Sequence, residues 1–258
     1  EHCGMQYLKD ITALDISEIT DAVKAEGHNR MAQVVRMVLI DVFKEAQHAG
    51  HVPPGCNPAQ ATKQPRNKIS RQRLSLEEWE AIYTSAEQQQ PYLQCGMLLA
   101  IVTGQRLGDI CNMKFSDVWD DMLHIEQEKT GTRLAIPLSL KNEALNITLS
   151  DVISKCRDAV VSKYLVHFRH STSQASRGDQ VSAKTLTSTF KKARDKSGLT
   201  WEEGTAPTFH EQRSLSERLY REQGIDTQKL LGHKTMKMTD RYNDDRGKEW
   251  IIVGKKAV

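Results

Sequence analysis

Long hydrophobic runs are absent from this sequence of 258 residues. No stretch approaches the roughly 18 consecutive apolar residues that indicate a membrane-spanning helix, and no signal-peptide pattern opens the chain. Cysteines are few, and no two of them form a Cys-x-x-Cys pair. This spacing excludes a zinc ribbon and a disulfide-stapled domain and fits a reduced cytosolic protein; the five are Cys3, Cys56, Cys95, Cys111 and Cys156.

Strong charge of one sign is also absent. The net charge is only +3, which does not by itself establish nucleic-acid binding, because the geometry of a basic patch matters more than the sum. The length allows one large domain or two modest ones. Because the chain starts with Glu1 and not with Met, we expect a fragment of a longer protein.

Two helices are predicted in the N-terminal region. Thr12 and Asp15 form a capping box that opens a helix to about Ala25, and a second helix ends before Gly50. Two helices make a poor core alone, so this unit, residues 1–58, is expected to lack its beginning. It is either a packing unit with solvated charges or a module laid on DNA. The apolar stripe of the second helix consists of Met31, Val34, Val35, Val38, Leu39, Val42 and Ala46.

A proline-rich and basic segment follows. No acidic residue occurs between His51 and Leu76, and several prolines break regular structure there. We interpret residues 59–73 as an interdomain linker, which either is simply solvated or follows the phosphates of DNA. Its candidate DNA-binding residues are Lys63, Arg66, Lys68, Arg71 and Arg73.

The second domain, residues 74–258, opens with a Ser75 and Glu78 capping box. A strongly apolar helix then ends at a Thr-Gly turn, and Arg106 follows almost directly. An arginine in this position has two interpretations. It is either paired with Asp109 as a structural salt bridge, or it is a phosphate clamp whose orientation Asp109 helps to set, and both can hold.

Alternating residues at 122–127 and 132–137 predict a β-hairpin with Lys129 at its tip. A lysine in such a turn is usually only exposed, but a mobile tip can also reach a bound substrate. Beyond it we expect a helix over 151–161, a short strand over 164–168 and a polar loop over 171–180. A Lys- and Arg-rich helix over 182–197 is either solvated or lies on a DNA backbone.

The block from Thr208 to Tyr242 contains an unusual set of side chains. A capping box of Thr208 and Glu211 is expected to start a helix that carries His210 and Arg213 outward. Short helices then follow on either side of a Gly-His turn at 232–233, and the last one carries Tyr242. Arginines that hold a phosphate, histidines that handle protons and a phenol that attacks are suited to a phosphodiester substrate. The apolar tail at 250–253 needs a sheet to join, in its own molecule or a neighbour.

Five motifs in this order resemble those of the tyrosine recombinases: residues 103–106 (TGQR), 128–131 (EKTG), 210–213 (HEQR), 230–234 (LLGHK) and Tyr242. The run YNDDRG at 242–247 is most similar to the integrases of lambdoid phages. The resemblance implies a mainly α, α+β catalytic domain, with helices and a small antiparallel sheet. A partial all-α, SAM-like core-binding domain would precede it. The connection between the helix of Arg213 and His233 is slightly shorter than in the phage enzymes.

The same resemblance implies a role for six residues. Tyr242 would attack the scissile phosphate and form a 3′-phosphotyrosine, which stores the bond energy for rejoining without ATP. Arg106 and Arg213 would hold the non-bridging oxygens. Lys129 would protonate the leaving 5′ oxygen, His210 would take the proton of the phenol, and His233 would donate a hydrogen bond to the phosphate.

No metal or other cofactor is implied, because two arginines supply the electrostatic stabilisation. His210 and Glu211 begin the zinc motif His-Glu-x-x-His, but its fifth position is Ser214, which excludes a metalloprotease. The implied partner is double-stranded DNA at core-type attachment sites in a bacterial host cell, cytoplasmic and nucleoid-associated. The enzyme would act there as a homotetramer, with DNA-bending accessory proteins as possible partners. Arm-site binding is not expected.

Two alternatives remain open at this point. A type IB topoisomerase has a similar set of residues and would relax supercoils as a monomer. A DNA-binding relative that kept the fold but lost the chemistry is the other, although the complete set of six residues argues against decay.

Overall fold

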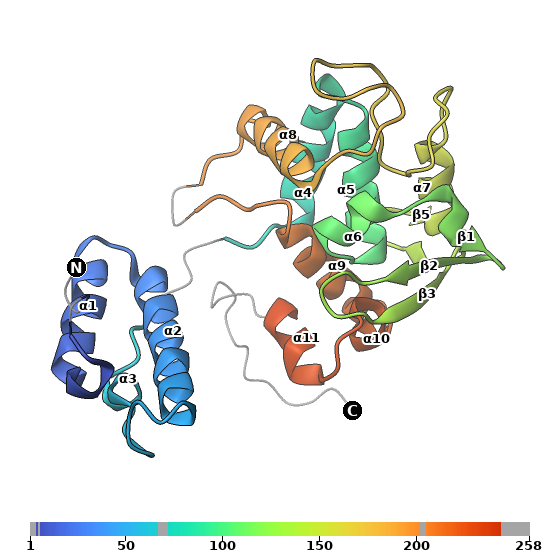
Figure 1. The fold of residues 1–258 in the computed structure, drawn as a ribbon. Helices are drawn as coiled ribbons and strands as arrows, with labels where there is room; N and C mark the ends of the chain where they lie inside the picture. Colours follow the sequence, from blue (N-terminus) through green and yellow to red (C-terminus); the bar gives the residue numbers. More distant parts are fainter. Residues whose placement is uncertain (1–3, 5, 67–71, 202–204, 244–258) are drawn as a thin grey trace, which may run out of the picture. The chain divides into compact units, whose positions relative to one another are not determined.

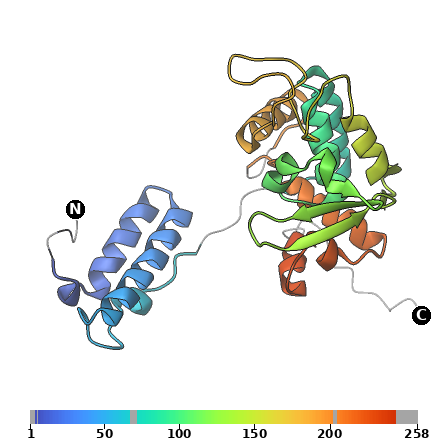
Figure 2. The same cartoon turned by 45° about the vertical axis from the view of Figure 1, so that its right-hand side comes forward.

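The computed structural model describes residues 4, 6–66, 72–201 and 205–243. The chain divides into two compact units, Glu1–Ile69 and Ser70–Val258, which are drawn in Figures 1 and 2. Among the described residues, no helix has the length and apolar character needed to cross a membrane.

The first unit is a small helical bundle. Its elements are η1 (Leu8–Asp10), α1 (Ala13–Ala25), α2 (Asn29–His48) and α3 (Pro58–Ala61). The predicted capping box of Thr12 and Asp15 is confirmed at the start of α1, since both side chains bond the backbone of the other residue.

The packing of α2 differs from the predicted stripe. Ala46 is buried as expected, but Met31, Val38 and Val42 are 56%, 51% and 41% exposed. The core of the unit is formed instead by Ile16, Phe43, Ala46, Val52 and Ala59. α1 and α3 pack against α2, and Leu8, Ile11 and Val52 join the same cluster, so part of the apolar stripe of α2 stays exposed.

The segment after α2 is tied back onto that helix. The Asn57 side chain donates to the carbonyl oxygen of Ile40 at 2.9 Å and accepts from Gln60 N–H at the start of α3. Arg36 of α2 donates to Thr62 Oγ1 and to the carbonyl oxygens of Gln60 and Thr62. The first residues of the expected linker therefore fold as part of the helical unit.

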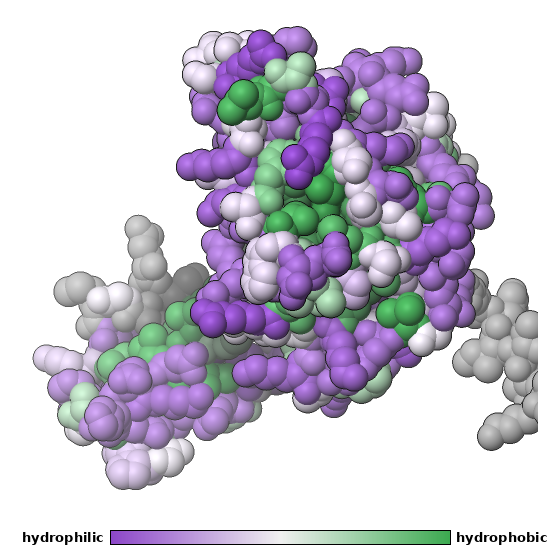
Figure 3. Space-filling model, turned by 90° about the vertical axis from the view of Figure 1, so that its right-hand side faces the viewer, coloured by the Kyte–Doolittle hydropathy of each residue, from purple (hydrophilic) through white to green (hydrophobic). Residues whose placement is uncertain are grey.

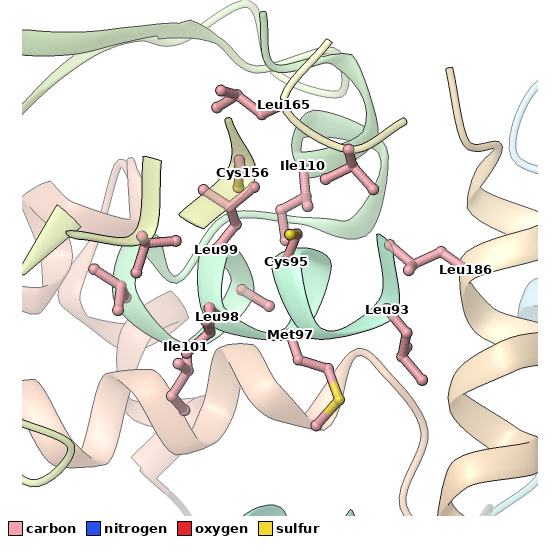
Figure 4. Packing of buried hydrophobic residues seen from close by; sticks show 14 of the residues in the cluster. Leu93, Cys95, Met97, Leu98, Leu99, Ile101, Ile110, Cys156, Leu165 and Leu186 are labelled. Atoms are coloured by element: carbon pink, nitrogen blue, oxygen red, sulfur yellow. The ribbon is translucent and has the colours of Figure 1, made fainter. Parts of the chain in front are cut away.

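The second unit is built around α5 (Tyr92–Thr103), in which nearly every residue is buried. Figure 4 shows its leucines, Met97 and Ile101 surrounded by side chains from other elements, among them Leu186 of α8 and Cys156 of α7. The other helices of this unit are α4 (Leu76–Ser85), η2 (Ala86–Gln88), α6 (Leu107–Asn112), α7 (Leu149–Cys156), α8 (Ala183–Lys196), α9 (Glu211–Glu222), α10 (Thr227–Leu231) and α11 (Met236–Asn243).

The strands form two small antiparallel sheets. After η3 (Phe115–Asp117), β1 (Val118–Trp119), β2 (Met122–Glu126) and β3 (Arg133–Pro137) pair in that order. The register places Leu123 opposite Ile136, so the predicted hairpin is confirmed. β4 (Lys141–Asn142) and β5 (Ile147–Thr148) form the second sheet. The sheet of β1–β3 lies against the helical body with β3 beside α10 (Figure 1).

Two predicted elements are wrong in extent or type. The helix expected over 151–161 is α7, which starts at Leu149 through a capping box of Thr148 and Asp151 and ends at Cys156. Residues 164–168 form only isolated bridges, Lys114 with Tyr164 and His167 with Gln180. Residues 163–165 bond the backbone of residues 113–115, and residues 166–168 bond that of residues 178–181. Because the partner changes after two or three residues, no continuous strand forms. The basic helix is confirmed as α8, with Ser182 as its N-cap.

The face drawn in Figure 3 is mostly hydrophilic, with hydrophobic residues gathered in its middle. One groove near the candidate site, about 720 Å³ in volume, lies between β3 and α10 and includes Gly232 and His233 in its lining.

Candidate active site

Arg106 is positioned by the glycine turn that ends α5. Gly104 has a φ of +63°, and a Cβ there would lie 2.8 Å from Leu231 Cδ2 and 3.0 Å from Ser216 Oγ. Only glycine fits this left-handed and crowded position without strain. The turn delivers Arg106 as the N-cap residue of α6, half-buried, with Nη1 donating to Gln127 Oε1 at 2.9 Å.

Gln127, which the motifs did not indicate, is a hydrogen-bond partner of Arg106. It is fully buried, and its Oε1 also accepts from Thr130 Oγ1 at 2.8 Å. Its Nε2 donates to Gln105 Oε1 at 2.7 Å and to the carbonyl oxygen of Leu231 at 3.0 Å. One signal could have found it. The alternation that turns residues 123 and 125 inward also turns residue 127 inward, so a glutamine there needs buried partners.

Asp109 supports the hairpin and does not pair with Arg106. Its Oδ1 accepts from the Glu128 N–H at 2.9 Å, and no ion pair of the described residues joins it to Arg106. The structural salt bridge considered from sequence is therefore wrong. A buried carboxylate bonded to this amide fixes the base of the turn that carries Lys129.

Lys129 itself lies exposed at the hairpin tip. It makes no hydrogen bond or ion pair with any residue in the described part of the chain. The structure thus places Lys129 on the expected turn but does not bring its amine into contact with the other candidate residues.

Arg213 is buried, contrary to the expected outward orientation. It is 1% exposed, with Nη1 donating to the Gly104 carbonyl at 2.6 Å and Nη2 donating to the Leu231 carbonyl at 2.7 Å. Burial lowers the pKa of Arg213 to about 10; the nearby Tyr242 phenol opposes this shift and the charge of Arg106 adds to it. The guanidinium is still a cation at neutral pH.

The start of α9 also differs from the prediction. His210, and not Thr208, is the N-cap residue, and it makes no side-chain capping bond. The Thr208 carbonyl accepts from the Glu211 N–H, and Phe209 is buried with its ring edge-on to Phe190. Burying Phe209 turns the chain before the helix starts, so Thr208 is drawn away from the capping position and His210 stays exposed.

His233 follows the second left-handed glycine, Gly232, which ends α10. Its Nε2 lies 3.0 Å from Arg213 Nη2 and its Nδ1 lies 2.9 Å from Thr239 Oγ1. Arginine can only donate, so Nε2 is the acceptor and the proton is on Nδ1. Burial, and then the charges of Arg213 and Arg106, lower the pKa of His233 to about 4, so the ring is neutral at pH 7.

Tyr242 lies in this cluster. Its ring stacks on His233 with centroids 5.3 Å apart and an interplanar angle of 24°, and Arg213 Cζ is 5.4 Å from the ring centroid. The His210 ring centroid is 6.0 Å away. The Tyr242 carbonyl accepts from Ser214 Oγ of α9 at 2.6 Å. Five of the six candidates therefore gather around the ends of α5, α9, α10 and α11.

The candidate DNA-binding residues fall into three groups. Lys63 and Arg66 are exposed, whereas Lys68 and Arg71 lie outside the described residues, as does the tail at 250–253. Arg73 is used within the catalytic unit. It pairs with Glu211 at 3.0 Å and donates to the Arg241 carbonyl, and its side chain is only 11% exposed. A phosphate-binding role for Arg73 does not fit these contacts.

Comparison with known proteins gives concordant results. The model of the phage integrase family matches residues 72–249. The integrase of Enterobacteria phage P21 is 82% identical over 257 residues, which are 100% of this chain and 68% of that protein. Prophage integrase IntE of Escherichia coli (strain K12) is 64% identical over 253 residues, 98% of this chain and 68% of its own length.

Solved structures agree with this assignment. A lambda integrase dimer bound to a COC′ core site has a TM-score of 0.88 at 40% identity, covering 97% of this chain and 86% of that one. A lambda integrase tetramer bound to a Holliday junction has a TM-score of 0.87 at 39% identity, covering 96% of this chain and 69% of that one. These relatives are integrases and not topoisomerases. The chain therefore belongs to the phage integrase family, the tyrosine recombinases that cleave and rejoin DNA at specific sites.

Proposed function

We propose that Tyr242 is the nucleophile through which this integrase cleaves DNA. The phenol oxygen forms a bond to the scissile phosphorus, the bond from phosphorus to the 5′ oxygen breaks, and a 3′-phosphotyrosine and a free 5′-hydroxyl result. Attack by that hydroxyl, or by one from a second duplex, reverses the step and rejoins the strand. The observation that carries this proposal is the position of the Tyr242 ring, stacked on His233 and against the Arg213 guanidinium.

Arg213 and Arg106 are proposed to bind the non-bridging oxygens. Arg213 is held by two carbonyl groups, and its buried Nε has no hydrogen-bond partner among the described residues. That donor is available for a phosphate oxygen. Arg106 is held by one hydrogen bond to Gln127, which leaves most of its fork for the substrate. Two fixed guanidinium groups match the charge of the transition state.

The proton transfers are assigned to exposed groups. His210, at the N-terminus of α9, is proposed to take the proton of the Tyr242 phenol, because a neutral hydroxyl group is a weak nucleophile. Lys129 is proposed to protonate the leaving 5′ oxygen, which requires the hairpin tip to close onto bound DNA. His233 is proposed to bond the phosphate. In the structure its Nε2 accepts from Arg213, so a bond from Nε2 to a phosphate requires the ring or its proton to rearrange.

We further propose that the substrate is double-stranded DNA with core-type attachment sites, and that four copies of the chain assemble on it to integrate or excise phage DNA. The lambda integrase structures, bound to a core site and to a Holliday junction, support this proposal. Lys63 and Arg66, and the exposed Lys184, Lys191 and Lys192 of α8, supply positive charge for the DNA backbone. We propose that the reaction takes place in the cytoplasm of a bacterial host, on its nucleoid.

A suicide substrate tests the proposed nucleophile. In a core-type site with a nick a few nucleotides to the 3′ side of the scissile phosphate, cleavage releases the short fragment that carries the new 5′-hydroxyl. The strand then cannot be rejoined, so the covalent adduct accumulates. We expect the adduct to map to Tyr242 and to disappear in Tyr242→Phe, while DNA binding in a gel-shift assay stays unchanged. An adduct on another residue, or one that persists in Tyr242→Phe, would refute the assignment.

A further inference from the structure

Helix α11 carries Tyr242 and is joined to the rest of the catalytic unit by few polar contacts. Ser214 and Arg73 donate to backbone carbonyls of its last turn, and Thr239 bonds His233. A further contact is an ion pair at 3.1 Å between Arg221 Nη2 of α9 and Asp240 Oδ1 of α11. Asp240 is two positions before Tyr242, so this pair acts close to the nucleophile.

The Arg221 side chain is bonded by a buried carboxylate one turn earlier on α9. The Glu217 side chain is 0% exposed, and its Oε1 accepts from Arg221 Nε at 2.6 Å and from Thr227 Oγ1 of α10 at 3.2 Å. Burying a carboxylate is costly unless it is paired, and the proposed chemistry assigns Glu217 no role. Its position is explained if it orients Arg221.

The Arg221 guanidinium therefore links α9 to α11. Nε lies on Glu217 inside the fold, and Nη2 points to Asp240, which is 55% exposed. The carboxylate of Glu217, followed by that of Asp240, raises the pKa of Arg221, so the guanidinium is a cation at neutral pH. The inner pair is fixed, while the outer pair is exposed to solvent and to salt.

We propose that Arg221, oriented by Glu217, is a positioning residue that holds α11 through Asp240 and keeps Tyr242 docked in the site of its own protomer. This inference rests on the proposed role of Tyr242 as the nucleophile. The Glu217–Arg221–Asp240 bridge acts on the position of α11 and not on the phosphate. It therefore affects the cleavage rate on bound DNA and leaves DNA affinity unchanged.

The test measures single-turnover formation of the covalent adduct on the nicked site at saturating DNA, together with the Kd for the same DNA. Asp240→Asn is expected to lower the rate about two- to five-fold, the range for a partly exposed ion pair, with Kd and Tm unchanged. Asp240→Glu, which keeps the charge, should recover most of the rate. Glu222→Gln removes one exposed carboxylate from α9 and should leave the rate unchanged.

A double-mutant cycle decides whether the two residues act together. Arg221→Lys keeps a charge beside Glu217 but loses the fork that reaches both carboxylates. If the bridge positions α11, Arg221→Lys combined with Asp240→Asn lowers the rate no further than Arg221→Lys alone. Amide hydrogen exchange over 236–243 in the DNA-free protein should speed up in both single variants.

Three outcomes contradict the bridge: an unchanged rate in Asp240→Asn, effects that multiply in the double variant, or a loss that appears in Kd. Failure of the proposed function is distinguishable from these, because the unmodified protein would then form no adduct at Tyr242.

Discussion

Arg213 and Lys129 lie at opposite extremes of burial within one candidate site. Arg213 is enclosed by the ends of α5 and α10 and bonds two carbonyl groups, whereas Lys129 lies on an exposed turn without a polar partner in the described part of the chain. His233 is buried like Arg213, and His210 is exposed like Lys129. The groups proposed to hold charge are built into the fold, and those proposed to move protons are exposed.

This difference has a physical reason. Electrostatic stabilisation is strongest when donors are fixed before the reaction and shielded from water, so burial of Arg213 serves its proposed role. A proton donor must reach an oxygen that is absent until DNA binds, and an exposed hairpin tip can move to it. Variants of the two groups should therefore fail in different ways.

Arg213→Ala should have the largest effect. Losing a fixed oxyanion donor lowers a reaction rate by about 100- to 1,000-fold. The Gly104 carbonyl would also lose its donor, and the Leu231 carbonyl would lose one of two. We expect cleavage of the nicked site to fall by that factor and Tm to fall as well. A cleavage rate close to that of the unmodified protein would show that the buried Arg213 does not stabilise the transition state.

Lys129→Ala should slow cleavage about 100-fold, the lower range for a general acid, with Tm unchanged. Because the amine is proposed to protonate the leaving oxygen, a substrate with a 5′-bridging sulfur, a better leaving group, should restore most of the rate. Arg133→Ala is the control, since Arg133 is an exposed cation of the same hairpin, 83% exposed. A fall in Tm for Lys129→Ala, or no rescue by sulfur, contradicts the assignment.

Gln127→Leu should lower both the stability of the protein and its cleavage rate. The change removes the acceptor of Arg106 and the donor to Gln105 Oε1, and one of the two donors to the Leu231 carbonyl. Leaving such buried groups unpaired costs about 1–3 kcal/mol, measurable by urea unfolding, and cleavage should fall with the loss of Arg106 orientation. Thr130→Ala removes only the Thr130 bond to Gln127 and should cost less. Equal stabilities for the two variants would show that Gln127 does not organise the site.

The smallest expected effect is a pH dependence from His233. Its pKa is lowered from 6.5 to about 4 in the folded protein, so between these values the unfolded chain binds more protons than the folded one. Stability from this group is fully present above pH 6.5 and decreases as pH falls toward 4. We expect Tm of the unmodified protein to fall over that range relative to His233→Gln. Parallel Tm curves would indicate that His233 is not held neutral by burial.

Motifs and local patterns predicted much of the fold and most of the proposed site. The capping boxes at Thr12 and Ser75 were confirmed, and so was the hairpin, because each depends on residues a few positions apart. Arg106, His210, Arg213, His233 and Tyr242 were indicated by motif and are gathered by the structure. Their proposed chemical roles stay predictions.

Contacts between distant residues could not be predicted in this way. The buried orientation of Arg213 depends on the Gly104 carbonyl, 109 positions earlier, and helical spacing alone placed its side chain outward. Arg73 belongs to a basic run that suggested DNA, yet it bonds the Arg241 carbonyl, 168 positions later. Its charge is satisfied by Glu211, which no local pattern relates to it.

The sequence by itself determined which residue types are present, where the short-range caps and turns form, and which family the motifs belong to. Only the tertiary structure decided which side chains are buried, that Gln127 connects Arg106 to the turn before His233, and that Arg221 bridges α9 and α11. The physical reason is range. A cap or a hairpin is stabilised by neighbours within a few positions, whereas burial and ion pairing depend on partners that the fold alone brings together.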